Sequence, residues 1–454
     1  MDYYNPYSMK QITNIDNLKE VQGLRINWKI GLRKFISLPA ILWIMLWFSI
    51  NTGPWVFEEL KPESIIEWLD WLRALFPYLV LILSGISLVF RRSKANLPGN
   101  VRNWLFYGLI GLLACALSPD PLNAVYWAVA YLSAFAAMKL YMGRKDMLDN
   151  IIHLNILSLL IVTFFLFALV FFSWDVLSAA KAAGQTGYYA YDQLPTIVNM
   201  PMSRSSGMAR FAAVPGILSF VFLWFGSDWK RFLWIIPLFS FGWIVYFMQS
   251  RGAVVAFAFV LAFEMLFLGG RKRIIGGFIL SLLGILLMSD LIPGQTFEAI
   301  SDYMKRGQET EDFYTMTGRT ITWKIAWSEI LNAPIIGRGF QADRYFLNGL
   351  HVHNTYLYAL MTSGFIGATG FVIGLLWSWR LFVRAIKRKY EDDPRHKIFL
   401  IQAGGILAFF TVRGITEVSG PLFNVDFMVM LPIMAYLGIL DSKYYQGEKL
   451  KIRW

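Results

Sequence analysis

About twelve runs of mostly apolar residues divide this chain of 454 residues. A helix needs about 20 such residues to cross the hydrocarbon core of a bilayer. The runs are continuous rather than alternating, which favours transmembrane helices over the strands of a barrel. The runs fall roughly at 35–51, 73–90, 103–118, 122–141, 152–173, 208–226, 232–249, 252–269, 274–292, 354–380, 398–416 and 422–440.

The composition supports the same interpretation. The chain is 56% hydrophobic and only 16% charged, whereas a soluble domain carries about 25% charged residues. The apolar content excludes an intrinsically disordered chain. Cys115 is the single cysteine, which excludes a disulfide scaffold. We therefore predict an all-α integral membrane protein with about 12 transmembrane helices.

Basic residues predict the orientation of these helices. The net charge is +12, and short basic clusters such as RRSK at 91–94 and RAIKRK at 384–389 are typical of cytoplasmic loops. Alternating spans then place both termini in the cytoplasm. The predicted organisation is a cytoplasmic N-terminal segment 1–34, spans one to nine over 35–292 with an outer loop at 174–207, a large outer loop at 293–353, spans ten to twelve over 354–440, and a cytoplasmic tail 441–454.

The large outer loop contains a helix-like segment. In GRTITWKIAWSEIL, Ile321, Ile325 and Leu331 alternate with polar residues at a spacing that suits a helix lying on the membrane face or capping a cavity. Loops this long without a role are uncommon. We expect a small extracytoplasmic helical cap at the functional end of the molecule.

Several ionisable residues remain unexplained by topology, and all fall on the outer side. A charge at membrane depth is costly and usually faces a cavity or a partner. Each also has a simpler interpretation: Arg251 could extend to the headgroups, Arg210 could be structural, Arg319 could pair with Glu311 or Asp312, and His351 could be an ordinary loop residue. The candidates are Arg204, Arg210, Arg251, Arg319, His351, His353 and Arg413.

The chemistry of these residue types indicates a phosphate-bearing ligand. Arginine presents a planar fork that matches phosphate oxygens, and histidine can accept a proton from a hydroxyl near neutral pH. Together they suggest a pyrophosphate leaving group held beside a base. The sequence contains no His-Glu-x-x-His motif and no cysteine cluster, so we expect a metal-independent mechanism and no cofactor.

The histidine motif resembles the signature of the O-antigen ligase and polymerase superfamily. His353-Asn354 is followed by nine residues and then by Gly364-x-x-Gly367. The segments SRSSG at 203–207, SRGA at 250–253, and TGRTITW with PIIGRGF at 317–340 are similar, more weakly, to the arginine motifs of that family.

The resemblance implies a membrane glycosyltransferase with a GT-C-like fold in the bacterial inner membrane, working in lipopolysaccharide biosynthesis. Such an enzyme moves a glycan from undecaprenyl pyrophosphate to lipid A–core oligosaccharide on the periplasmic face, without metal or nucleotide. By position, His353 would be the base, and Arg204, Arg251 and Arg319 would hold the pyrophosphate. Asn354, Gly364 and Gly367 would support them. Arg210 and Arg413 match no family motif and are kept as weaker candidates.

Two other functions stay open at this point. An O-antigen polymerase would join lipid-linked repeat units with the same motifs. A polysaccharide or lipid transporter would also suit twelve helices, although it should carry binding groups near the midplane. The expected partners are the lipid-linked glycan donor, a glycan acceptor and membrane lipids, with no nucleic acid.

Overall fold

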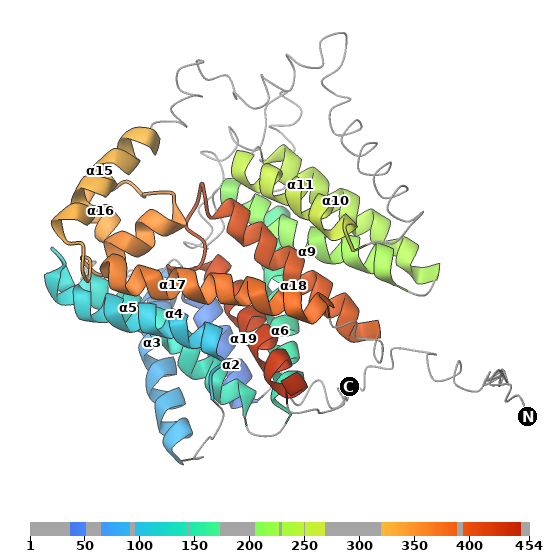
Figure 1. The fold of residues 1–454 in the computed structure, drawn as a ribbon, viewed down its shortest axis with the longest axis horizontal. Helices are drawn as coiled ribbons and strands as arrows, with labels where there is room; N and C mark the ends of the chain where they lie inside the picture. Colours follow the sequence, from blue (N-terminus) through green and yellow to red (C-terminus); the bar gives the residue numbers. More distant parts are fainter. Residues whose placement is uncertain are drawn as a thin grey trace, which may run out of the picture.

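The computed structural model shows an assembly of helices (Figure 1). The structure describes residues 37–50, 65–90, 96–143, 146–172, 205–226, 229–248, 250–267, 319–387 and 394–445. In chain order its helices are α2 (Leu38–Phe48), α3 (Ile65–Phe90), α4 (Gly99–Ala114), η3 (Cys115–Leu117), α5 (Pro121–Met142), α6 (Met147–Phe172), α9 (Ser205–Phe225), η5 (Trp229–Trp234), α10 (Ile235–Phe247), α11 (Arg251–Met265), α15 (Arg319–Asn332), α16 (Ala342–Phe346), α17 (Thr355–Lys387), α18 (Pro394–Arg413) and α19 (Val425–Tyr445).

Eight helical segments within these ranges are long and apolar enough to cross a membrane. They correspond to α3, α4 with η3, α5, α6, α9, η5 with α10, α17 and α19. No β-strand occurs in the described part of the chain. The protein is therefore an all-helical, multi-pass membrane protein, as its apolar runs predict.

The count of about twelve spans stays a prediction. The run at 35–51 forms only the short helix α2, of 11 residues. The run at 252–269 forms α11, of 15 residues, and the run at 398–416 falls in α18, which is not among the eight. The run at 274–292 lies outside the described residues.

Helices α4 and α17 pack closely because small residues line their contact. A Cβ atom on Gly374 of α17 would lie 2.6 Å from the ring of Trp104 and 2.8 Å from the carbonyl oxygen of Asn100. Small residues at such interfaces let helix backbones approach each other. Asn100 then donates hydrogen bonds to Ser378 at 2.9 Å and to the carbonyl oxygen of Met434 at 2.8 Å. These bonds join α4, α17 and α19.

Helices α15 and α16 lie together at one end of the molecule and form a small cap beside the start of α17 (Figure 1). Ala326 and Ile330 of α15 are buried in a hydrophobic cluster with Tyr358 of α17. The opposite side of α15 leaves Ile321 and Ile325 exposed. The cap therefore has the two faces that the sequence pattern predicts, one packed and one open.

Candidate functional site

The site is built around the first turn of α17. Oδ1 of Asn354 accepts hydrogen bonds from the backbone N–H groups of Tyr356 and Leu357, both at 2.9 Å. This is the N-cap arrangement, in which a side chain satisfies the free donors at a helix start. Asn354 therefore begins α17, and the residue before it, His353, is held in the left-handed region with a φ of 46°. Such backbone conformations persist where the surrounding contacts enforce them.

A second segment, the loop between α18 and α19 at residues 414–424, docks onto this helix start. The backbone N–H of Thr355 donates to the carbonyl oxygen of Gly414 at 2.9 Å. Its hydroxyl accepts from the N–H of Ser419 at 2.8 Å and donates to the carbonyl oxygen of Glu417 at 2.9 Å. Nδ2 of Asn354 donates to the carbonyl oxygen of Ile415 at 3.0 Å. The Asn-Thr pair after the histidine thus fixes the 414–424 loop beside it.

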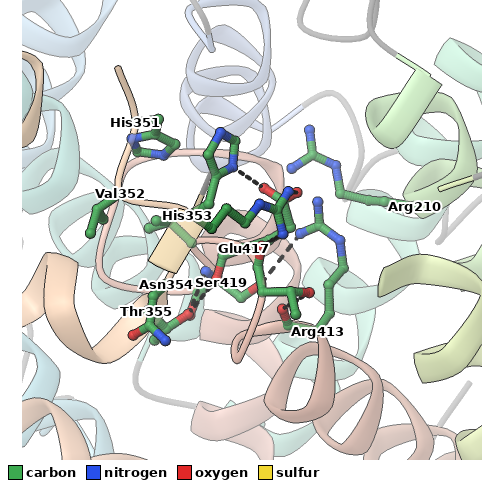
Figure 2. A network of polar contacts seen from close by, with 12 residues as sticks. Arg210, His351, Val352, His353, Asn354, Thr355, Arg413, Glu417 and Ser419 are labelled. Atoms are coloured by element: carbon green, nitrogen blue, oxygen red, sulfur yellow. Dashed lines mark hydrogen bonds and ion pairs between the residues drawn. The ribbon is translucent and has the colours of Figure 1, made fainter. Parts of the chain in front are cut away.

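This docking places Glu417 against His353 (Figure 2). Nδ1 of His353 and Oε2 of Glu417 are 2.9 Å apart. Nη2 of Arg319, the first residue of α15, donates to Oε1 of the same carboxylate at 3.1 Å, and its Nη1 donates to the carbonyl oxygen of Thr416 at 2.7 Å. Arg319 therefore pairs with Glu417, whereas Glu311 and Asp312 lie outside the described residues.

The electrostatics of the pair favour an ionised carboxylate beside a neutral imidazole. Burial lowers the pKa of His353, and this effect outweighs the opposing pull of Glu417. Burial alone would raise the pKa of Glu417, but the hydrogen bond from His353 and the charges of Arg413, His353 and Arg319 hold that pKa well below its usual range. A neutral His353 donates its Nδ1–H to Glu417, which leaves Nε2 as a proton acceptor.

Two further candidates, Arg210 and Arg413, meet at a fully buried carboxylate. Oδ1 of Asp426 accepts from Nη1 of Arg210 at 2.8 Å, and Oδ2 accepts from Nη1 of Arg413 and from the hydroxyl of Ser419. Figure 2 shows both guanidinium groups on the same side of the 414–424 loop as Glu417. The weaker candidates of the sequence analysis thus become part of the site through Asp426.

The charges of this network do not cancel. Among these described side chains, three guanidinium groups, those of Arg210, Arg319 and Arg413, accompany the two carboxylates of Glu417 and Asp426. With His353 neutral, the group carries an excess of one positive charge. A partly buried excess of arginine charge suits a phosphate oxygen.

The remaining predicted arginines differ in what can be said of them. Arg251 begins α11, and a Cβ atom on its neighbour Gly252 would lie 2.6 Å from Oγ1 of Thr416. The start of α11 therefore meets the same loop as Glu417. Arg204 lies outside the described residues.

Gly364 and Gly367 lie on α17, away from the polar network. Gly364 breaks this helix with φ 59° and ψ −167°. The segment 334–339 satisfies the opened backbone: Arg338 N–H donates to Met361 at 2.8 Å, and Phe365 N–H donates to Pro334 at 2.7 Å. A Cβ atom on Gly364 would collide with the carbonyl oxygen of Ile335. The two glycine-containing motifs are therefore complementary halves of one backbone joint, which explains their spacing without any contact to a ligand.

Sequence reasoning missed Glu417 and gave Asp426 no role. The signal for Glu417 was present, since an acid stands in the short segment between two apolar runs, four residues after Arg413. Its pairing with His353 depends on tertiary structure. Within the described ranges, no group of three or more His, Cys, Asp or Glu residues could hold a metal ion.

The fold and this network define a multi-pass membrane protein with a histidine–carboxylate pair and an arginine cluster at one end of its helices. Residues 235–372 match the family model described as O-antigen ligase, so the chain contains an O-antigen ligase domain. This confirms the resemblance seen in the histidine motif. Arg251, Arg319 and His353 lie inside the matched segment, and Arg210, Arg413 and Glu417 lie outside it. A search of curated proteins finds no match to this chain.

Proposed function

We propose that this protein is a membrane glycosyltransferase that moves a glycan from undecaprenyl pyrophosphate to lipid A–core oligosaccharide at the periplasmic face. The O-antigen ligase domain supports lipid-linked glycans as the substrate class. The observation that carries the proposal is the 2.9 Å pairing of His353 with Glu417 beside the arginine cluster. This pairing supplies a proton acceptor next to an excess positive charge, which are the two requirements of glycosyl transfer from a pyrophosphate.

The proposed reaction is a single displacement. Nε2 of His353 accepts the proton of the acceptor hydroxyl as its oxygen bonds to the anomeric carbon of the donor glycan. The bond from that carbon to the pyrophosphate breaks, and undecaprenyl pyrophosphate leaves with the electron pair. Glu417 stabilises the imidazolium that forms, and the arginine cluster, with Arg204 and Arg251 as further members, stabilises the leaving group. One displacement inverts the anomeric centre.

The same proposal includes the membrane arrangement. We infer about twelve spans in a GT-C-like arrangement, cytoplasmic termini and a periplasmic 293–353 loop, because the basic clusters favour that orientation. Single cysteines replacing Ser328 of the cap and Ser442 of α19, both exposed, test it after Cys115 is replaced. A membrane-impermeant maleimide should label position 328, but not position 442, in cells with a permeabilised outer membrane. The reverse result would overturn the orientation.

A deletion strain and purified components test the function. We expect lipid A–core without polymer, accumulation of lipid-linked polymer, and transfer of polymer to lipid A–core by the purified protein. Lipid A–core that carries a single repeat would instead identify a polymerase. Accumulation of lipid-linked glycan on the cytoplasmic face, with no transfer activity, would identify a transporter.

The proposed mechanism uses no metal. Transfer should therefore persist in EDTA at a concentration that inactivates a metal-dependent glycosyltransferase assayed in parallel. Loss of transfer in EDTA, with recovery after a divalent ion is added, would overturn this part of the proposal.

A further inference from the structure

A second histidine–carboxylate pair lies beside the first. Asp343, on α16 of the cap, has a fully buried side chain. Its Oδ2 contacts Nδ1 of His351 and also accepts from the backbone N–H of Val352 at 3.2 Å. His351, with only 14% of its side chain exposed, is therefore not the ordinary loop residue that its position in the sequence allows.

The ring of His351 is held between two other rings. Its centroid lies 5.2 Å from that of His353 at an interplanar angle of 70°, and 5.8 Å from that of Tyr358 at 72°. The hydroxyl of Tyr358 accepts from the N–H of Gln341 at 3.2 Å, just before α16. Edge-to-face contacts of this kind restrict the plane of each ring. The cap therefore contacts the ring of His353 through His351.

We propose that His351, held by Asp343, is a positioning residue that fixes the ring of His353 and favours its neutral form. The proposal rests on the proposed function, in which His353 is the base. The edge of His351 limits rotation of the neighbouring imidazole, so that Nε2 stays directed away from Glu417. A protonated His351 also repels a second proton on His353.

The charged groups around the pair agree with this role. Burial alone would raise the pKa of Asp343, but His351, Arg344 and the N–H of Val352 hold it below its usual range, so the carboxylate is ionised. His353 faces Glu417 and Arg319 on its other sides, and Arg413 acts on Glu417. Removing the charge from His351 therefore removes one of two cations that oppose protonation of His353.

The test is the pH dependence of the His353 imidazole in purified full-length protein without substrate. Diethyl pyrocarbonate modifies neutral imidazole, and mass spectrometry can follow the peptide that carries His353. In H351Q and D343N, the pH at which His353 becomes reactive should rise relative to the wild type. In transfer assays, the acid limb should move to higher pH, with kcat down roughly tenfold and KM for the donor unchanged, since misorientation affects the reaction more than binding.

Tyr345→Phe is the matched control. Tyr345 is also on α16 and docks the cap elsewhere, through a 2.6 Å hydrogen bond to Asp120. It should leave the modification profile of His353 unchanged. An unchanged profile in both H351Q and D343N, or an equal shift in Y345F, would overturn the positioning role. Shifted profiles in a protein that transfers no glycan would refute the proposed function and leave the positioning of His353 intact.

Discussion

Oε2 of Glu417 lies 2.9 Å from Nδ1 of His353, although 64 residues separate them in the chain. The contact forms because Asn354 and Thr355, directly after the histidine, bind the backbone of the 414–424 loop. A carboxylate on Nδ1 selects the tautomer whose Nε2 is free to accept a proton. The residues that begin α17 therefore also assemble the candidate base.

Replacement of His353 is the most direct test of this base. His353→Ala should reduce transfer by about 10²–10⁴-fold, the usual contribution of general-base assistance, while donor binding persists. His153→Gln serves as a histidine control, because His153 lies near the turn between α5 and α6, at the end of α5 opposite the cap contact. Near-wild-type transfer by the His353 variant would eliminate the base role.

Glu417→Gln preserves the size and a hydrogen-bond acceptor but removes the charge. The imidazolium that forms during transfer then loses its counter-charge, so kcat should fall by roughly 10- to 100-fold, within the range of acid–base assistance. Glu417 raises the pKa of His353 against the dominant effect of burial. Without it that pKa falls further, and the acid limb of the pH–rate profile should move to lower pH, opposite to the shift expected for H351Q. A pH profile of kcat in both variants distinguishes the two directions.

Arg319→Lys tests the geometry of the arginine rather than its charge. Arg319 uses separate nitrogens for the carbonyl oxygen of Thr416 and for Glu417. A lysine keeps the charge but lacks the planar fork, so we expect transfer to fall about tenfold, since charged hydrogen bonds are worth about 1.5–3 kcal/mol. Arg251→Lys and Arg204→Lys should weaken donor binding for the same reason. Full activity in all three lysine variants would contradict the pyrophosphate role.

Gly364→Ala tests the backbone joint of α17. The new methyl group would collide with the carbonyl oxygen of Ile335, and the backbone there has φ 59° and ψ −167°. We expect a loss of stability of roughly 3 kcal/mol or more, because strain and overpacking add. Gly349→Ala is the matched control, since Gly349 also has a positive φ, of 82°, but no atom near the added Cβ. Its cost should be about 1–2 kcal/mol. Thermal melts of both variants in detergent measure the difference, and equal melting temperatures would contradict the joint.

Local signals predicted some residues of the site and not others. His353 and Asn354 stand in a motif with fixed spacing, and Arg319 opens a recognisable helix. Arg210 and Arg413 were visible only as charges near span ends, because their shared partner Asp426 comes from a third helix, α19. Gly364 and Gly367 were grouped with the site because of their motif, whereas their contacts show a joint with segment 334–339.

The sequence by itself determined that the chain is helical and crosses a membrane, because both properties follow from long apolar runs read along the chain. It also determined the histidine motif and the arginines that accompany it. Only the tertiary structure decided that Glu417 pairs with His353, that Asp426 joins Arg210 to Arg413, and that His351 contacts both Asp343 and His353. The physical reason is that a hydrogen bond or an ion pair depends on positions within a few ångströms. Those positions are set by how helices distant in the chain pack together, which no local pattern encodes.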